Sequence, residues 1–488
     1  MKIAFLLLAL VFTGYQIAAQ GNQLQKTDSV CQLVTKYFNE GKAGMLYELT
    51  GPHYRQKNTR AVFEKKCERD WFPMGEIRKC SLQHTKHGIS KYKTVFNKVI
   101  LELSLGLDDN DKLRQFSFAI SDDEKAPANY TLSTSNPLAT DLDKEVDAEV
   151  RNYMMEKQTV GLSVGILENG KTTFYGYGET ERGNRQLPNE HTIFEIGSIT
   201  KTFTAILLAY AANEGRLKLD DPVNKYLPDS IPPLEYEGTP ITLKAMANHS
   251  SGIPRMPSNF HYSDYQDPVK DYNNNDLFSF YRHFKLKRRP GKKYEYSNLA
   301  LGTVGVILSR IYGMNYESLV VNEICNPLGM NDTRQFIRKE DSLRFAKGYG
   351  SGGMFNFLFD CDAFAGAGGL RSTTADLLKY AAANMGKAPS ALNQAILLTQ
   401  RVTFKPRVLG INMSKPRISL KKIGLVWEIA RPGPHETIEH GGLTPGFVSY
   451  LVIDPGKKVA VVILSNTRVL MPVAAHNIFK WIEKDVLK

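Results

Sequence analysis

"FEIGSITKTFTAILLAYAANEG", residues 194–215, is the stretch with the clearest structural signal in the chain. From Phe203 onward its apolar residues recur at intervals of three and four, which predicts a buried helix over about 194–216. Ser198 and Lys201 lie three residues apart and so share one face of the first turn. A lysine where a helix enters a core has two explanations. Its side chain either runs along apolar surface to reach water, or activates a nucleophile.

The second explanation requires a neutral amine. A serine hydroxyl is a poor nucleophile until a neighbouring group accepts its proton, and burial or nearby positive charge would let Lys201 do so. Gly197 precedes the serine at the expected helix N-terminus, where free backbone N–H groups can stabilise an oxyanion. Because a Ser-x-x-Lys pair is common by chance, an active site needs further residues.

Two later segments carry residues suited to the same chemistry. In YEYSNLALGTVGVIL (294–308), Tyr296 could relay a proton to a leaving group and Asn298 could donate to a substrate carbonyl. The alternative is a Ser-Asn helix cap with a packing tyrosine. In EHGGLTPGFVSY (439–450), His440 precedes two glycines at the start of a predicted strand, where a substrate backbone could approach closely. The alternative is an exposed histidine in a glycine turn.

In this order, Ser-x-x-Lys, Tyr-Ser-Asn and His-Gly-Gly resemble the motifs of the serine β-lactamase and penicillin-binding-protein superfamily. They look most like its class C β-lactamase-related branch, which includes D-alanyl-D-alanine carboxypeptidases, D-aminopeptidases and esterases. The likeness covers about residues 143–488. It includes four flanking segments: EGRLKLDDPVNKYLP (214–228), NHSSGIP (248–254), GAGGLRSTTADLLKY (366–380) and DPGKKVAVVILSN (454–466).

The resemblance implies an acyl-enzyme mechanism that uses neither a metal nor another cofactor. Three residues would be catalytic. Ser198 would be the nucleophile, Lys201 would accept or electrostatically tune its proton, and Tyr296 would act as general acid and base. Four would bind the substrate or its oxyanion: Asn298, His440, Gly442 and Leu443. Within this set, the backbone N–H groups of Ser198 and Leu443 would form the oxyanion hole.

His440 departs from the superfamily pattern, because β-lactamases usually carry a lysine there, followed by Thr-Gly. An ordinary histidine, with a pKa of about 6.5, is mostly neutral at pH 7 and suits a β-lactam carboxylate less well than a permanent cation. Gly441 also lacks the hydroxyl of the usual threonine. The sequence therefore predicts a peptidase or esterase of the same mechanism rather than an efficient β-lactamase.

The segment pattern of residues 143–488 predicts an α+β sandwich, in which helices flank an antiparallel sheet built from both ends of the region, with a large helical insert. An Asn-Gly turn makes residues 160–178 a hairpin. Two strands around a Pro-Gly turn follow at 446–466, and a final helix runs from Pro472 to Lys484. GLSVG (161–165) matches the nucleophile elbow of α/β-hydrolases, but that motif requires a strand, a turn and a helix, so Ser163 is interpreted as structural.

The N-terminal part predicts a separate organisation. MKIAFLLLALVFTGYQIAA (1–19) has the layout of a secretory signal peptide. Residues 20–120 predict a small α+β accessory domain, with helices at 29–41 and 59–71 and then paired strands. This part resembles the cone-shaped domains related to nuclear transport factor two. Residues 121–142 are poor in large apolar side chains and predict a linker.

Composition excludes several functions. With 62 Lys+Arg against 50 Asp+Glu, the chain is mildly basic, and its densest basic run, KLKRRPGKK (285–293), is interpreted as a solvated loop rather than a nucleic-acid site. Beyond the leader, no apolar run approaches the ~18 residues of a membrane span. His53, His84 and His87 lack a supporting metal-ligand pattern and are interpreted as surface residues. The five cysteines form no Cys-x-x-Cys pair, and a pairing among Cys31, Cys67 and Cys80 stays open alongside free thiols.

Together these features predict an exported serine hydrolase, periplasmic or secreted, that acts on an amide or ester. Its substrate would be a D-amino-acid peptide, an ester or a β-lactam-like molecule, with peptidoglycan-derived peptides as one source. The alternative is a catalytically silent protein of the cell envelope that binds peptidoglycan on the same scaffold.

Overall fold

The structure is a computed structural model that describes residues 24–97, 100–119, 132–157, 159–260, 271–350, 353–355, 362–406, 422–430, 436–469 and 471–485. The chain forms two compact units, one made mainly of residues 1–124 and one mainly of residues 125–488. We call them the N-terminal and C-terminal domains. The predicted leader and residues 121–131 of the predicted linker lie outside the described residues.

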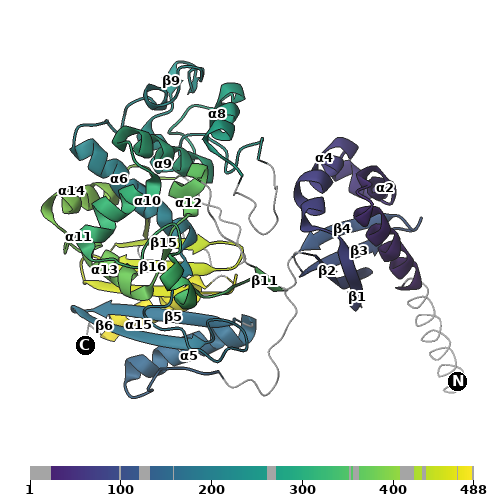
Figure 1. Cartoon of the computed structure of the whole chain (residues 1–488), viewed down its shortest axis with the longest axis horizontal. Coiled ribbons are helices and arrows are strands. Elements are labelled where there is room, and N and C mark those ends of the chain that lie inside the picture. Colours follow the sequence, from purple (N-terminus) through teal and green to yellow (C-terminus); the bar gives the residue numbers. More distant parts are fainter. Residues whose placement is uncertain are drawn as a thin grey trace, which may run out of the picture. The chain divides into compact units, whose positions relative to one another are not determined.

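The N-terminal domain is a four-stranded antiparallel meander in the order β1-β2-β3-β4, packed with helices (Figure 1). A first helix includes residues 24–39, so the chain is already helical five residues before the predicted start at Ser29. The predicted 59–71 helix is an α-helix that continues as a π-helical turn, η1. The remaining elements are α2 (Ala43–Glu48), α3 (Pro52–Lys57), α4 (Arg60–Lys66), η1 (Cys67–Trp71), η2 (Phe72–Met74), β1 (Ile77–Lys86), β2 (Ile89–Phe96), β3 (Ile100–Leu107) and β4 (Leu113–Ala119).

Aromatic rings fill the interior of this domain. The Trp71 ring centroid lies 5.1 Å from those of Phe116 and Phe118, and Phe63 is 1% exposed with its ring 5.6 Å from Trp71. Strand β2 alternates between half-buried and buried residues, as expected for a sheet with one face on a core. Helix 24–39 and strand β1 also meet through free thiols, since the sulfurs of Cys31 and Cys80 lie 3.0 Å apart.

The C-terminal domain is built on a seven-stranded antiparallel sheet in the order β13-β14-β15-β16-β17-β5-β6. Strand β17 pairs with β5, with Val459 opposite Glu168, so both ends of the domain meet in one sheet as predicted. The strands are β5 (Gly161–Glu168), β6 (Lys171–Gly178), β13 (Lys422–Ile423), β14 (Glu428–Ala430), β15 (Thr437–Leu443), β16 (Val448–Asp454) and β17 (Val459–Ser465).

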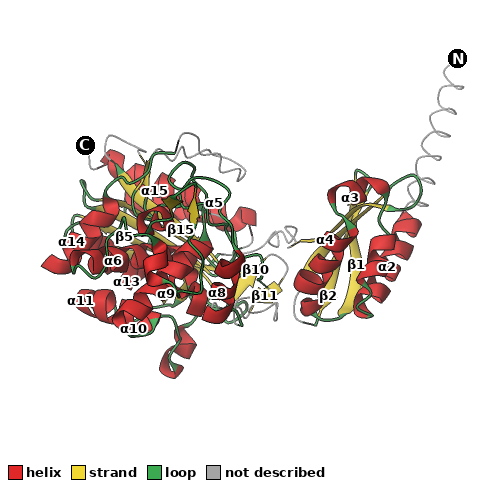
Figure 2. Cartoon of the chain, turned by 90° about the horizontal axis from the view of Figure 1, so that it is seen from above, coloured by secondary structure: helices red, strands yellow, loops and turns green. Residues whose placement is uncertain are grey.

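Helices cover both faces of this sheet (Figures 1 and 2). Helices α5 (Asp141–Lys157) and α15 (Pro472–Asp485) bury one face, in a core that includes Val164, Ile166 and Val461. Helix α13 (Thr374–Asn384) packs on the other face, where Gly165 lets its Thr374 and Leu378 approach closely. The helical insert contains α6 (Thr200–Asn213), α7 (Leu243–Ala247), α8 (Asn274–His283), α9 (Asn298–Tyr312), α10 (Tyr316–Val320), η5 (Val321–Cys325), α11 (Asn326–Leu328), α12 (Ala365–Gly368) and α14 (Ser390–Gln400).

Short elements connect these layers. They are β7 (Phe194–Glu195), η3 (Gly197–Ile199), η4 (Val223–Tyr226), β8 (Glu235–Tyr236), β9 (Thr239–Pro240), η6 (Lys339–Arg344), β10 (Gly348–Gly350), β11 (Gly353–Phe355), η7 (Asp362–Phe364) and β12 (Arg371–Ser372). The predicted single helix over 194–216 is therefore wrong at its start. The segment begins as strand β7, passes through the 3₁₀ turn η3, and becomes α-helical only at Thr200.

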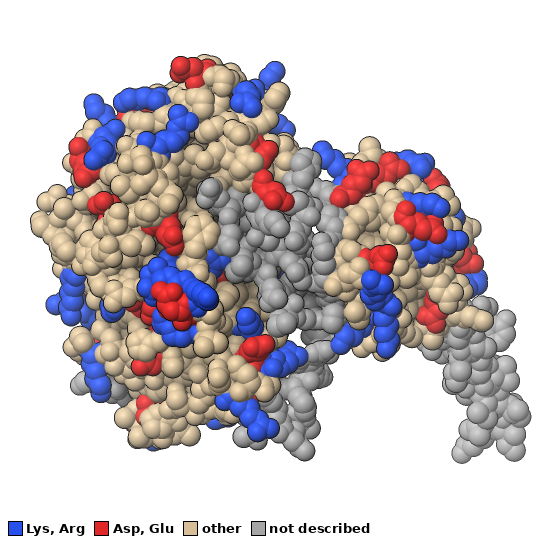
Figure 3. Space-filling model, viewed as in Figure 1, with Lys and Arg blue, Asp and Glu red and all other residues tan. Residues whose placement is uncertain are grey.

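On the face shown in Figure 3, Lys and Arg lie interspersed with Asp and Glu in both domains. Among the described helices, none combines the length and the apolar character that a membrane span requires.

Candidate active site

Ser198 lies in the turn η3, between strand β7 and helix α6, and its side chain is half-buried. The turn packs tightly on strand β15. A Cβ on Gly197, whose φ is +48°, would lie 2.8 Å from the backbone nitrogen of Leu443, and one on Gly442 would lie 2.0 Å from the carbonyl oxygen of Ile196. Glycine at both positions therefore lets the serine turn reach the strand edge.

Lys201 is fully buried in the first turn of α6. Its Nζ lies 2.8 Å from Ser198 Oγ and also donates to the carbonyl oxygen of Ala367. Burial, and then the positive charge of Arg255, hold the pKa of Lys201 well below its ordinary value of 10.5. Since both causes disfavour the ammonium form, the lysine can present a lone pair to the serine hydroxyl.

Tyr296 completes the group around the serine. Lys201 Nζ lies 5.0 Å from its ring centroid. Burial raises the pKa of Tyr296 above 10, against smaller lowering effects of the neighbouring Ser198 hydroxyl and of the Arg255 charge, so the phenol keeps its proton at neutral pH. Ser297 is the N-cap of α9, and its Oγ accepts from the Ala300 N–H at 2.9 Å. The helix-cap interpretation of this segment is therefore correct for Ser297. The tyrosine before it, Tyr296, lies at the Ser198 site.

Asn298 is the first residue of α9 and is half-buried. Its Nδ2 donates to Met256 Sδ at 3.6 Å. A thioether is a weak acceptor, so this contact can be exchanged for a substrate carbonyl at low cost.

His440 is 3% exposed in the middle of β15, where it pairs with Leu451. The predictions of a strand start and of an exposed glycine turn are therefore wrong, because β15 begins at Thr437 and carries the histidine inward. Its Nδ1–H donates to the Gly441 carbonyl at 2.8 Å, which leaves Nε2 as an acceptor. Burial, then the nearby Lys201, lower the pKa of His440 to about 3. The ring, 6.4 Å from that of Tyr296, is neutral at pH 7.

Sequence reasoning missed two residues at this site, both in the segment 248–257. His249 is 1% exposed, and its ring stacks on Tyr296 with centroids 4.4 Å apart. Its Nδ1 accepts from the Ser297 N–H at 3.2 Å. Arg255 is exposed, and its guanidinium carbon lies 5.0 Å from the Tyr296 ring centroid. The NHSSGIP segment stands out in the sequence only by its resemblance to the superfamily, and nothing in its spacing shows that it folds against Tyr296.

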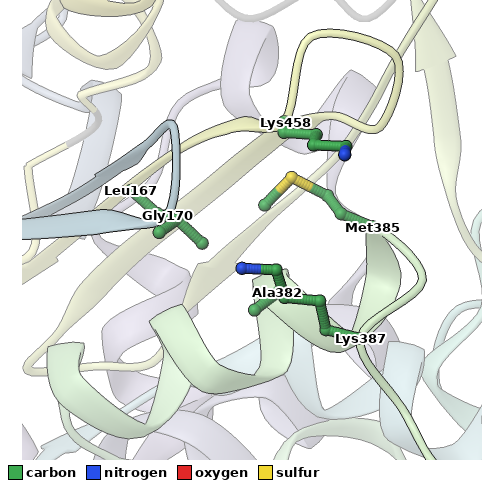
Figure 4. Close-up of a pocket in the computed structure, with 6 residues that line it drawn as sticks. All are labelled: Leu167, Gly170, Ala382, Met385, Lys387 and Lys458. Atoms are coloured by element: carbon green, nitrogen blue, oxygen red, sulfur yellow. The ribbon is translucent and has the colours of Figure 1, made fainter.

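Other candidate residues lie elsewhere. Ser163 Oγ, on β5, hydrogen-bonds at 3.0 Å with Thr374 Oγ1 at the start of α13, and this serine is structural. His53, His84 and His87 are exposed. A separate hollow lies between the β5–β6 turn and the end of α13, and it contains none of the predicted site residues (Figure 4). Its lining is Leu167, Gly170, Ala382, Met385, Lys387 and Lys458.

A serine beside a buried amine whose ammonium form is disfavoured, with a protonated tyrosine and a glycine-edged strand, defines a serine hydrolase site. The family model described as Beta-lactamase matches residues 146–482, and the chain belongs to this family of serine hydrolases. An additional N-terminal region precedes the match.

Among its relatives, a β-lactamase of Pseudomonas fluorescens is 30% identical over 349 residues, which cover 67% of this chain and 94% of the relative. The D-alanyl-D-alanine-carboxypeptidase/endopeptidase AmpH of Escherichia coli K12 is 27% identical over 326 residues, 65% of this chain and 82% of the relative. A solved class C β-lactamase aligns with a TM-score of 0.61 and 25% identity, over 71% of this chain and 98% of that one. The solved β-lactamase/D-alanine carboxypeptidase of Yersinia pestis aligns with a TM-score of 0.60 and 24% identity, over 71% of this chain and 99% of that one. This likeness shows the shared fold.

Proposed function

We propose that this chain is an exported hydrolase that cleaves an amide or ester through an acyl-enzyme on Ser198, with peptides or esters preferred over β-lactams. The observation that carries the proposal is the 2.8 Å contact between Ser198 Oγ and the buried amine of Lys201. A neutral amine at that distance can take the hydroxyl proton as the oxygen attacks.

The reaction would proceed in two halves. Lys201 accepts the Ser198 proton while Oγ bonds to the substrate carbonyl, and the N–H groups of Ser198 and Leu443 hold the oxyanion. Tyr296 donates its proton to the leaving atom as the substrate bond breaks, and is reprotonated from the lysine. In the second half Tyr296 passes its proton to the Lys201 amine as it takes one from the attacking water, the acyl bond to Oγ breaks, and Oγ takes the proton back from Lys201.

The preference for peptides or esters rests on His440. A β-lactam carboxylate would meet a neutral imidazole there, because burial and Lys201 hold the pKa of His440 near 3. Both β-lactamases and a D-alanyl-D-alanine carboxypeptidase are among the relatives, so the family alone leaves the substrate open.

The proposal is tested by Ser198→Ala, assayed with p-nitrophenyl acetate, nitrocefin and a panel of D-amino-acid peptides. We expect turnover to fall to background and labelling by a fluorophosphonate to disappear. Ser163→Ala, which removes the serine hydroxyl of the unrelated G-x-S-x-G sequence, is the control and should keep both. Unchanged turnover in Ser198→Ala would refute the nucleophile. Complete inertness of the native protein toward substrates and label would favour the silent binding protein.

Export is a separate part of the proposal and rests on the leader-like residues 1–19. Intact-mass analysis of protein recovered outside the cytoplasm should give a mature chain that begins at Gln20. A chain that keeps Met1 would contradict this part and leave the chemistry unaffected.

A further inference from the structure

Arg255 is the permanent cation among the groups that surround Tyr296. His249 and His440 have lowered pKa values and are neutral at pH 7, and the buried Lys201 is held toward the amine form. Glu428, the acidic group whose charge Tyr296 senses, has its pKa raised to about 8 by burial and by Glu439, so it is largely protonated. A guanidinium stays charged in any of these surroundings.

The guanidinium is free to take a ligand. Arg255 is exposed, and within the described parts of the chain it forms no ion pair with a carboxylate. Other arginines of this part of the domain are engaged. Arg288 pairs with Glu295 at 2.8 Å, and Arg289 donates to Thr239 Oγ1 at 2.9 Å.

The backbone of Arg255 is fixed against the start of α9. Its carbonyl oxygen accepts from the N–H groups of Asn298 and Leu299 at 3.1 and 3.2 Å, and Ser297 Oγ donates to the preceding Pro254 carbonyl at 2.7 Å. The three residues that hold this backbone, Ser297, Asn298 and Leu299, follow Tyr296 directly in the chain. Arg255 therefore keeps its place beside the tyrosine, as a preorganised binding site requires.

The position beside Tyr296 identifies the part of the substrate that Arg255 would meet. Tyr296 gives its proton to the leaving atom, so its neighbours face the leaving group. When that group is an α-amino or α-hydroxy acid, its carboxylate is attached to the carbon next to the leaving nitrogen or oxygen. Such a carboxylate would lie within reach of a guanidinium 5.0 Å from the tyrosine ring. A guanidinium binds a carboxylate through two parallel N–H donors.

We propose that Arg255 binds a carboxylate on the leaving group, so that the enzyme favours substrates that release an α-amino or α-hydroxy acid. The inference rests on the proposed acyl-enzyme function. It assigns the recognition of charge to the 248–257 segment rather than to His440 on β15.

A matched pair of substrates isolates this charge. Both carry the same D-amino-acid acyl group, and they release either D-lactate or D-lactamide, which have nearly the same shape and differ in charge. We expect native protein to favour the lactate ester, and Arg255→Gln to reduce the ratio of the two kcat/KM values by about 10- to 100-fold, the range of a charge-assisted contact. Arg255→Lys should keep part of the preference, and Arg289→Gln should keep all of it.

Arg255 also acts on Lys201, and a pH profile separates the two effects. Because its charge lowers the pKa of Lys201, its removal raises that pKa, and the acid limb of kcat/KM moves to higher pH for both substrates. The shift should stay below about one pH unit, since solvent screens an exposed charge. The ratio is therefore measured above this limb.

An equal loss for both substrates in Arg255→Gln, or no preference in native protein, would overturn the inference. In either case fluorophosphonate labelling of Ser198 and hydrolysis of p-nitrophenyl acetate would still support the acyl-enzyme. Loss of those two activities in native protein would instead refute the function on which the inference rests.

Discussion

The two domains differ in the ionisable side chains that their interiors hold. The N-terminal domain is filled by rings, such as the cluster of Trp71, Phe116 and Phe118. The C-terminal domain buries ionisable side chains in its core, including Lys201 at 0% and His440 at 3% exposure. Burying such groups costs free energy unless they are paired or neutralised. The first interior serves packing, whereas the second keeps costly groups that, under the proposed function, act on a substrate.

One buried pair in the C-terminal domain shows a structural use of charge. Arg371 on β12 and Glu195 on β7 are 1% and 2% exposed and lie opposite each other in the strand pair. Arg371 Nη2 lies 3.4 Å from Glu195 Oε1. Glu195 lies three residues before Ser198, so this pair helps to position the serine turn.

The largest expected effect comes from Lys201→Met, which replaces the buried amine by an apolar side chain of similar length. We expect kcat/KM to fall at least about 10³-fold, because the serine loses its proton acceptor. Lys225→Met, at an exposed lysine 3.0 Å from Asp221, should leave activity unchanged. Retained activity in Lys201→Met would show that the buried amine is not the base.

The stability of Lys201→Met should depend on pH with a defined sign. In the native protein the pKa of Lys201 is lowered, so below 10.5 the unfolded chain binds a proton that the folded chain does not. Native stability therefore rises with pH in this range. The variant lacks this dependence. Its unfolding free energy minus that of native protein should therefore be larger at pH 7 than at pH 10, which means that the variant is relatively more stable at pH 7. Urea titrations at the two pH values measure it, and a constant difference would contradict the lowered pKa.

A packing change in the N-terminal domain should lower stability and leave hydrolysis unchanged. Phe63→Ala should lower the unfolding free energy of the N-terminal domain by about 3–5 kcal/mol, as for other buried aromatic truncations. Hydrolysis of p-nitrophenyl acetate should not change. Val62→Ala, on the same helix at a side chain that is 59% exposed, is the control. Calorimetry and the ester assay on the same samples test this, and a parallel fall in activity would remove the distinction between the two interiors.

The smallest expected effect is that of His440→Lys. A cation at this position should favour carboxylate-bearing substrates by about 1 kcal/mol, or several-fold. The gain is small because Arg255 already supplies a permanent positive charge to the site. The lactate and lactamide esters measure it, with His440→Gln as the neutral control. An equal change for the two esters would contradict a role of residue 440 in charge recognition.

The parts of the fold that local patterns encode were predicted from the sequence. The Asn169–Gly170 turn gave the β5–β6 hairpin, and the apolar repeat after Phe203 gave the body of α6. The start of α6 was not predicted, because η3 forms where Gly197 meets β15, a strand over 200 residues later in the chain. Such long-range contacts override local propensity.

The candidate site divides in the same way. Ser198, Lys201 and Tyr296 were found because their motifs carry chemistry in a short window. His249 adopts a positive φ of 60° and stacks on a ring 47 positions further on, and Arg255 is defined only by where its loop folds. Neither feature has a local pattern, since histidine is uncommon in this backbone region and a lone arginine is usually a surface residue.

The pairing of β17 with β5 also sets the order of events when the chain is made. The Gly161 N–H donates to Asn466 Oδ1, 305 residues later, so the sheet under the serine closes only after Asn466 has been synthesised. The meander of the first domain, whose strands pair with their neighbours, needs no such wait. A chain halted before β15 would lack the strands that complete this sheet, and under the proposed function we expect it to show no hydrolysis.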